Sequence, residues 1–235
     1  KMYADLPDVQ LETRLRENIY HIHPRRVDIG GTEEEIYKIT KEDLYLCYNN
    51  FYSPNHMFLL VVGNFPIDEA MQVIHEELDK KDNLPKAKIS PIKEKNTVRK
   101  KRDSFTSSIQ VPKIGMGLKI AVSELGEFDD LELDLYLTMF STMLFGSSSL
   151  FRERVRNQKL LNNFFTDWDN IDDYKTLMIL ASTNEPEQLL QEIRMELSSH
   201  ELDQDMFNRM KKVWIANEVK MADYIDSTVN NIYDD

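Results

Sequence analysis

The hydrophobic pattern of the first eighty residues predicts helices around one buried strand. Apolar residues recur at helical spacing over residues 8–20, over the segment that follows Thr40, and over residues 66–79. The seven residues 57–63 form a continuous apolar run that ends in glycine, which is typical of a strand covered on both faces. Residues 21–32 contain a proline and paired glycines, and we expect a loop there.

Two threonines predict helix starts in this region. Thr32 can cap a short helix through Glu35, and Thr40 stands three residues before Asp43, the spacing of a capping box. The second helix is expected to end at Ser53-Pro54 and to bury Leu44, Cys47, Tyr48 and Phe51. In the helix over 66–79 we expect the inward side chains to be Ala70, Val73, Ile74 and Leu78.

The second half of the chain predicts four strands and four helices. The strands are expected at 104–111, 115–123, 161–169 and 174–182, and the last two are joined by residues 170–173. The helices are expected at 129–144, at 149–158 behind a Ser149 cap, after Asn184 with Pro186 in the first turn, and from about Asp203. The inner face of the helix at 129–144 is expected to be Leu131, Leu135, Met139, Phe140 and Met143. That of the helix after Asn184 is expected to be Leu189, Leu190, Ile193 and Leu197, and the last helix is expected to bury Leu202, Met206, Met210, Val213 and Trp214. The fold class is therefore α+β.

A change of composition between the halves predicts a linker. Residues 80–95 contain lysines and prolines and little that could pack, and we place the linker itself at 86–95. This gives a first domain at 1–85 and a second at 96–235. The chain begins at Lys1 without an initiator methionine, and we expect it to be truncated at both ends.

Charge and cysteine content narrow the function. The formal charge is -12, with 41 acidic against 29 basic residues, so the chain is expected to repel nucleic acid and to attract basic or unfolded peptides. Six bases fall within residues 93–102 without interleaved aromatic residues, and a solvated strand edge is the preferred interpretation. The single cysteine, Cys47, favours a cytoplasmic setting and a buried thiol. No apolar run reaches the ~18–20 residues of a membrane helix.

No complete catalytic or metal site follows from the residues themselves. His75-Glu76 begins like a zinc-peptidase helix, but Asp79 occupies the position of the second histidine, so an ordinary helix end is preferred. His21 and His23 alternate in the predicted loop without a third ligand, and a structural loop is the preferred interpretation. Gly115-Met116-Gly117 lies in a predicted strand rather than at a helix start, which excludes a dinucleotide fingerprint.

Several ordered segments resemble the M16 family of zinc peptidases, the insulysin and mitochondrial processing peptidase relatives, and in particular a Gram-positive, YmfH-like branch. The segments are His23-Pro24 followed by Gly31-Thr32 and residues 39–44, residues 51–57 followed by 61–64, and residues 145–151 followed by Arg156. The resemblance covers nearly the whole chain. It implies two α+β units with antiparallel-rich sheets backed by helices, the first incomplete.

The resemblance also implies where the chemistry lies. The family binds zinc through an inverted HxxEH motif and a later glutamate, and all of these would precede Lys1. The chain would thus contain no catalytic or metal-binding residue and no cofactor, with zinc expected in the full-length parent. Many members hold the substrate backbone with an arginine and a tyrosine. Arg156 falls at the arginine position, whereas Asn162 replaces the tyrosine, with Phe164 and Phe165 close by.

The leading hypothesis is a fragment of a processing-type M16 zinc endopeptidase that forms chamber wall and peptide-facing surface and is inactive alone. A non-catalytic M16-like scaffold or partner subunit is the alternative. Either would bind peptide or unfolded polypeptide and form a homo- or hetero-oligomer with another M16-like subunit. A third reading, an unrelated acidic peptide-binding module, predicts one compact domain.

Overall fold

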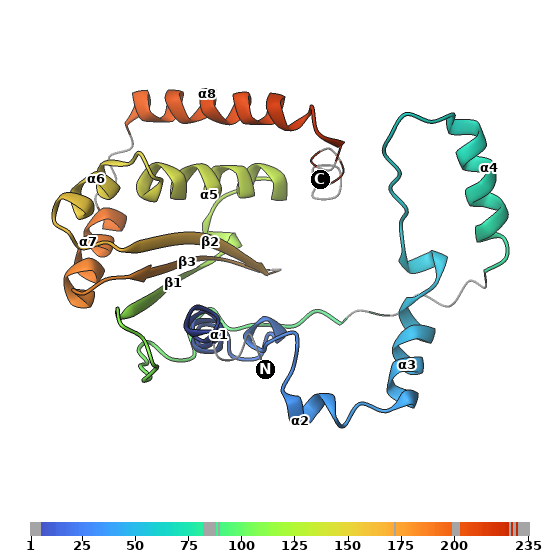
Figure 1. Ribbon diagram of the computed structural model, residues 1–235, viewed down its shortest axis with the longest axis horizontal. Helices are drawn as coiled ribbons and strands as arrows, with labels where there is room; N and C mark the ends of the chain where they lie inside the picture. Colours follow the sequence, from blue (N-terminus) through green and yellow to red (C-terminus); the bar gives the residue numbers. More distant parts are fainter. Residues whose placement is uncertain are drawn as a thin grey trace. The chain divides into compact units, whose positions relative to one another are not determined.

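The computed structural model describes residues 6–81, 88, 90–171, 173–198, 203–225, 227 and 229. The chain divides into two compact units, whose helices and strands are drawn in Figure 1. Unit 1 comprises Lys1–Gly31 and Ile92–Lys211, and unit 2 comprises Thr32–Pro91 and Lys212–Asp235. The predicted domain boundaries at 1–85 and 96–235 stay a prediction, and residues 86, 87 and 89 of the predicted linker lie outside the described part of the chain.

Unit 1 is built on a three-stranded antiparallel sheet in the order β1-β3-β2. Strands β2 (Asn163–Ile171) and β3 (Tyr174–Ser182) form a hairpin, and β1 (Lys113–Ala121) pairs with the other side of β3. Lys113 lies opposite Ser182, and Ala121 lies opposite Tyr174. Eight of the nine residues of β3 are buried, because it has a strand on each side and helices on both faces. The predicted α+β class is confirmed, and so are the strands predicted at 115–123, 161–169 and 174–182, which correspond to β1, β2 and β3.

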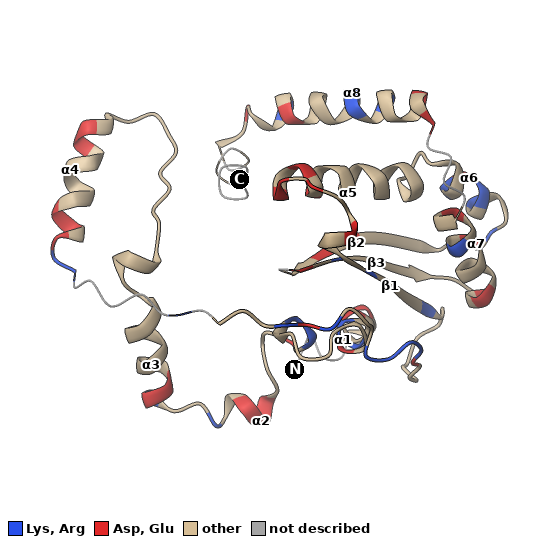
Figure 2. Ribbon diagram, turned by 180° about the vertical axis from the view of Figure 1, so that it is seen from behind, with Lys and Arg blue, Asp and Glu red and all other residues tan. Residues whose placement is uncertain are grey.

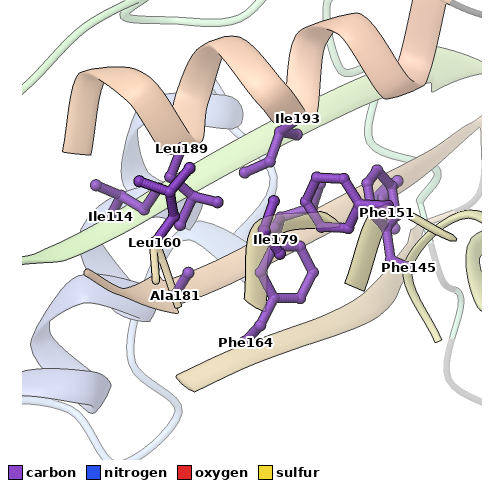
Figure 3. Packing of buried hydrophobic residues seen from close by; sticks show 11 residues of the cluster. Ile114, Phe145, Phe151, Leu160, Phe164, Ile179, Ala181, Leu189 and Ile193 are labelled. Carbon is purple, nitrogen blue, oxygen red and sulfur yellow. The ribbon is translucent and has the colours of Figure 1, made fainter. Parts of the chain in front are cut away.

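Three helices cover one face of this sheet: α5 (Asp130–Phe145), α6 (Leu150–Asn157) and α7 (Pro186–Ser198). Figure 3 shows that the rings of Phe145, Phe151 and Phe164 lie against one another, with centroids 5.1–5.7 Å apart. Burying a side chain of this size contributes about 1.5–3 kcal/mol. The rest of this core consists of Ile114, Val155, Leu160, Leu177, Ile179, Ala181, Leu189 and Ile193. The inner face predicted for α7 is confirmed.

The opposite face is covered by helix α1 (Pro7–Ile19), which the sequence predicted closely. Helix α1 packs closely against β1 because two positions of the strand are glycines, Gly115 and Gly117, which have no side chain. A Cβ added at Gly117 would lie 2.5 Å from Cδ1 of the buried Ile19, and one added at Gly115 would lie 3.3 Å from Cδ1 of Leu11. The Gly-Met-Gly sequence is therefore a packing feature, since glycine suits a strand position that another element approaches closely.

Unit 2 contains α2 (Glu33–Ile36), α3 (Lys41–Phe51) and α4 (Ile67–Leu78), and Figure 1 shows an extended run of chain before α4. Both predicted capping boxes, at Thr32 and at Thr40, are present. These local signals depend only on residues three positions apart, which explains why they could be read from sequence.

The burial predicted for unit 2 is wrong for the described structure. On α3, Leu44, Tyr48 and Phe51 expose 63%, 55% and 53% of their surface, and Cys47 is exposed rather than buried. On α4, Val73 and Leu78 are exposed, while Ala70 and Ile74 are half-buried. Residues 57–63 are extended but pair with no described strand, so they form no sheet. The described part of unit 2 contains no strand layer against which these apolar faces could pack.

Two further predictions in unit 1 are wrong. Residues 104–111 are irregular rather than a strand. Residues 93–102 are not a strand edge but run beside α1, where Lys100 N–H donates to Asn18 O at 2.9 Å and Arg99 Nε to Glu17 O at 2.5 Å (Figure 2). Bases there compensate the negative end of the helix dipole.

Helices α5 and α8 present faces other than those predicted. Helix α5 buries Leu133 and Leu137 in place of Leu131 and Leu135, because it is apolar on nearly all sides and periodicity could not select a face. Met139 and Met143 are buried as predicted. In α8 (Gln204–Met221) no described residue is buried: Val213 is exposed, and Met206, Met210 and Trp214 are half-buried. Leu202 lies outside the described residues.

Candidate functional site

Arg156, the predicted substrate-binding residue, lies in the last turn of α6. Ser149 Oγ caps this helix by accepting a hydrogen bond from Arg152 N–H at 3.2 Å. Phe151 and Val155 are fully buried on its inner side, and Arg156 is exposed. Among the described residues no ion pair or hydrogen bond engages the Arg156 guanidinium. It is therefore available to a ligand.

Its neighbour Arg154 has a structural role. Its Nη2 lies 2.6 Å from Glu196 Oε2, and its Nε lies 2.9 Å from Glu192 Oε2. The hydrogen bond to Glu196 and the second carboxylate raise the pKa of Arg154 further above its already high ordinary value, although burial opposes them. Figure 2 shows the charges of α6 and α7 in this part of unit 1. Arg154 therefore fastens α6 to α7.

Arg152 adds a second cation beside Arg156. Its guanidinium carbon lies 4.9 Å from the ring centroid of Phe164, a cation–π geometry. Its Nε and Nη1 are buried and have no hydrogen-bond partner among the described residues. Burial lowers the pKa of Arg152, and the positive charge of Arg156 lowers it further. The two arginines stand one turn apart on α6, and the exposed guanidinium of Arg156 could bind a carbonyl or carboxylate oxygen.

The predicted partner position of Arg156 does not supply an aromatic hydroxyl. Asn162 is exposed, and its backbone N–H donates to Ser182 O at 3.0 Å. Phe164 belongs to the core, whereas Phe165 exposes 56% of its surface. Of the two phenylalanines in this stretch, only Phe165 could therefore touch a peptide, and the substrate contact of Arg156 stays a prediction.

A buried carboxylate that the sequence reading missed joins α1 to the sheet. Asp169 on β2 is 1% exposed and accepts hydrogen bonds from Arg25 Nε at 2.6 Å, Tyr20 Oη at 3.0 Å and Arg16 Nε at 3.3 Å. Burial raises the pKa of Tyr20, its hydrogen bond with Thr176 opposes the shift, and the charge of Asp169 adds to it. An aspartate inside a strand is unusual unless it is paired, and this was the available signal.

A second buried carboxylate, Glu94, holds the loop that follows α1. It accepts the backbone N–H groups of His21, Ile22 and His23 at 2.8–2.9 Å, and Lys119 Nζ lies 3.2 Å from it. Burial alone would raise the pKa of Glu94, but these hydrogen bonds hold it at about 2. Glu94 lies in the predicted linker, yet it is a buried part of unit 1.

His21 and His23 stabilise this loop. His23 Nδ1 accepts the N–H of Arg25 at 3.2 Å, and His21 Nε2 lies 3.2 Å from Thr97 Oγ1. The predicted structural loop is confirmed. His75 is exposed near the end of α4, as an ordinary helix end requires. Within the described ranges no three His, Cys, Asp or Glu residues group closely enough to hold a metal ion, so these residues do not fit a zinc centre; His200 lies outside those ranges.

Most of the chain is similar in sequence to known peptidases. Residues 38–213 match the family described as Peptidase M16 inactive domain. A zinc protease of uncharacterized role from Bacillus subtilis (strain 168), YmfH, is 32% identical over 228 residues, which covers 95% of this chain and 52% of that protein. The chain thus spans about half the length of this curated relative.

Solved structures show the same fold. An M16-like peptidase from Alicyclobacillus acidocaldarius superposes with a TM-score of 0.85 at 28% identity, covering 98% of this chain and 56% of that one. A protease from Helicobacter pylori superposes with a TM-score of 0.81 at 18% identity, covering 99% and 57%. The chain therefore belongs to the M16 peptidase family, and its matched region is of the inactive-domain type.

Proposed function

We propose that this chain supplies the non-catalytic, peptide-facing part of an M16 zinc peptidase, where it forms a wall of the chamber that holds the substrate. The observation that carries the proposal is the match of residues 38–213 to the inactive domain of the family. The curated relative that it half covers is named a zinc protease, which supports zinc chemistry in the full-length protein. In this proposal the zinc centre belongs to a part of that protein outside the present chain.

The peptide-facing role rests on Arg156 and on charge. An exposed guanidinium without a protein partner among the described residues can donate to a substrate carbonyl oxygen. The formal charge of -12 favours a basic or unfolded polypeptide over an acidic one. We place the protein in the cytoplasm, because a chain with one cysteine needs no oxidising compartment. None of the described helices has the length and apolar character needed to cross a membrane.

Peptide binding without cleavage tests the proposal. The probe is fluorescein-labelled, reduced and carboxamidomethylated lysozyme, an unfolded basic chain, with binding followed by anisotropy, cleavage by gel electrophoresis and zinc by mass spectrometry. We expect binding without turnover. Arg156→Ala should weaken binding by about tenfold, the worth of one hydrogen bond to a charged donor. Arg209→Ala, which removes an exposed arginine from α8, is the charge-matched control and should bind as the parent does.

Two results would contradict the proposal. Stoichiometric zinc with turnover of the probe would show that the chain holds its own catalytic site. Equal affinity of the Arg156→Ala and Arg209→Ala variants would remove Arg156 from the peptide-facing surface.

A non-catalytic scaffold or partner subunit is the second candidate, and the inactive type of the matched domain favours it. It predicts a full-length protein without an intact HxxEH motif and later glutamate. The leading proposal predicts that both are present. In either case we expect the chamber to close against a second M16-like subunit, and sequencing the full-length gene separates the two candidates.

A further inference from the structure

Glu192 is a buried charged residue on the inner side of α7. It is 7% exposed and stands in sequence between Leu189 and Ile193, which are fully buried in the core of unit 1. A carboxylate in such a position is costly unless it is paired. Arg154 Nε donates to Glu192 Oε2 at 2.9 Å, and Gln158 Nε2 donates to Glu192 Oε1 at 3.3 Å. One carboxylate of α7 therefore binds two side chains of α6.

These two side chains stand on either side of Arg156 in the sequence. An α-helix turns by about 100° per residue, so positions 154 and 158 lie about 40° apart on its surface. Position 156 lies about 160° from each of them, on the opposite side of the helix. Glu192 therefore fixes the rotation of α6 about its axis. This rotation directs Arg156 away from α7 and into solvent, which agrees with its exposure.

The end of α6 is also fixed through its backbone. Lys159 has a φ of +59°, a left-handed conformation that residues other than glycine rarely adopt. Leu160 N–H donates to Val155 O at 2.9 Å, and Lys159 N–H donates to Arg156 O at 3.0 Å, which is the Schellman pattern of a helix end. Val155 and Leu160 are both buried in the core. Because such a backbone persists only where surrounding contacts determine it, the turn that carries Arg156 is held in place.

Arg154 also compensates the negative charges that α7 presents to α6. Besides its contact with Glu192, its Nη2 lies 2.6 Å from Glu196 Oε2, and its guanidinium carbon lies 5.7 Å from the ring centroid of Phe151. Both carboxylates therefore lie against Arg154, on the side of α6 away from Arg156. The positive charge of Arg156 stays available to a carbonyl or carboxylate oxygen.

We propose that Glu192 is a positioning residue for peptide binding: through Arg154 and Gln158 it holds α6 at the rotation that presents Arg156 to the peptide. This inference rests on the proposed function, because the position of Arg156 affects binding only if Arg156 contacts the peptide. Glu192 itself is buried, so it acts through α6 and not on the peptide directly. A buried acid on the neighbouring helix thus contributes to the affinity for a peptide that it does not touch.

Anisotropy with the carboxamidomethylated lysozyme probe tests the inference on the full chain, in two variants that change the charge in opposite directions. Glu192→Gln keeps the shape and leaves Arg154 paired with Glu196, whereas Arg154→Met keeps the alkyl stem and removes the guanidinium. Both should weaken probe binding by about fivefold, which is within the range of coupling between contacting residues. Long-range charge alone would shift the two affinities for a basic probe in opposite directions, because one variant loses a negative charge and the other a positive one.

The controls separate positioning from charge and from a purely structural role. Glu187→Gln on α7 and Arg209→Met on α8 make the same charge changes at exposed positions, and their affinities should be within about twofold of that of the parent. In an Arg156→Ala background, neither Glu192→Gln nor Arg154→Met should weaken binding further. A positioning residue has no effect on affinity once the residue that it positions has been removed.

Three results would overturn this inference and leave the proposed function intact. The first is binding by Glu192→Gln and Arg154→Met as strong as that of their controls, while Arg156→Ala binds more weakly. The second is an equal loss of affinity from Glu192→Gln with and without Arg156. The third is a change of opposite sign in the two variants. Equal affinity of Arg156→Ala and its arginine control would instead remove the proposed function and this inference with it. Urea unfolding of each variant verifies that it is folded, and Arg154→Met alone decides the outcome if Glu192→Gln is not.

Discussion

Replacing Glu94 by glutamine should cost unit 1 a large part of its stability. Glu94 is buried, and its carboxylate accepts three backbone N–H groups and pairs with Lys119, whose side chain is 2% exposed. Glutamine retains the shape but loses one acceptor site and the negative charge. Lys119 would then be buried without a counter-ion, a change that typically costs about 3–5 kcal/mol.

The pH dependence of this effect has a definite sign. The pKa of Glu94 is about 2 in the folded protein, below the ordinary 4.5. A depressed pKa contributes stability that is fully present above pH 4.5 and is lost as the pH falls to about 2. At 1.36 kcal/mol per pH unit this contribution is about 3 kcal/mol. Glu94→Gln has no such group, so its unfolding free energy should approach that of the parent as the pH falls.

Urea unfolding between pH 2 and 7 measures the difference. Trp168 packs in the unit 1 core, and its Nε1 donates to Leu137 O at 3.0 Å, so its fluorescence in a Trp214→Phe background reports on unit 1. Glu127→Gln, at an exposed position, is the isosteric control and should follow the parent. The reasoning fails if the gap between parent and Glu94→Gln is below about 1 kcal/mol at pH 7, or if it does not narrow between pH 5 and pH 2.

Four further predictions concern single residues. Gly117→Ala should destabilise unit 1 by about 1–2 kcal/mol in urea unfolding, because the added Cβ would lie 2.5 Å from Cδ1 of the buried Ile19. Gly115→Ala is the control, and its unfolding free energy should be within about 0.5 kcal/mol of that of the parent. Gly146→Ala should lower the melting temperature more than either, because its Cβ would lie 2.3 Å from a backbone carbonyl oxygen that cannot move aside. Asp169→Asn should cost about 2–3 kcal/mol, because two arginines lose their buried counter-charge, and a cost below about 1 kcal/mol would contradict that role. The exposed Cys47 should react with Ellman's reagent in the native protein at the rate of the unfolded chain, and protection would show that α3 is covered in solution.

Local signals in the sequence predicted much of unit 1 correctly. The hairpin of β2 and β3, the Ser149 cap and the inner face of α7 all depend on residues close together in sequence. The irregular course of residues 104–111 could not be predicted in this way, because a strand requires a neighbour and the pattern of one segment does not reveal it. The candidate site residues show the same dependence on how far apart in sequence the interacting residues are. Arg156 was found by resemblance, while Asp169 and Glu94 were missed because the groups of α1 and of the loop after it that donate to them are 71–153 residues away.

For residues 57–63 the sequence pattern predicts a buried strand, whereas the described structure has an exposed, extended segment. Their apolar, branched pattern is that of a strand buried on both faces, and Leu59 and Val61 are nevertheless exposed. Leu59 and Val61 expose 66% and 47% of their surface, so covering what remains exposed would contribute about 2–3 kcal/mol. Strand β1 shows a similar mismatch, because among the described strands it pairs only with β3, and it is partly buried whereas β3 is almost wholly buried.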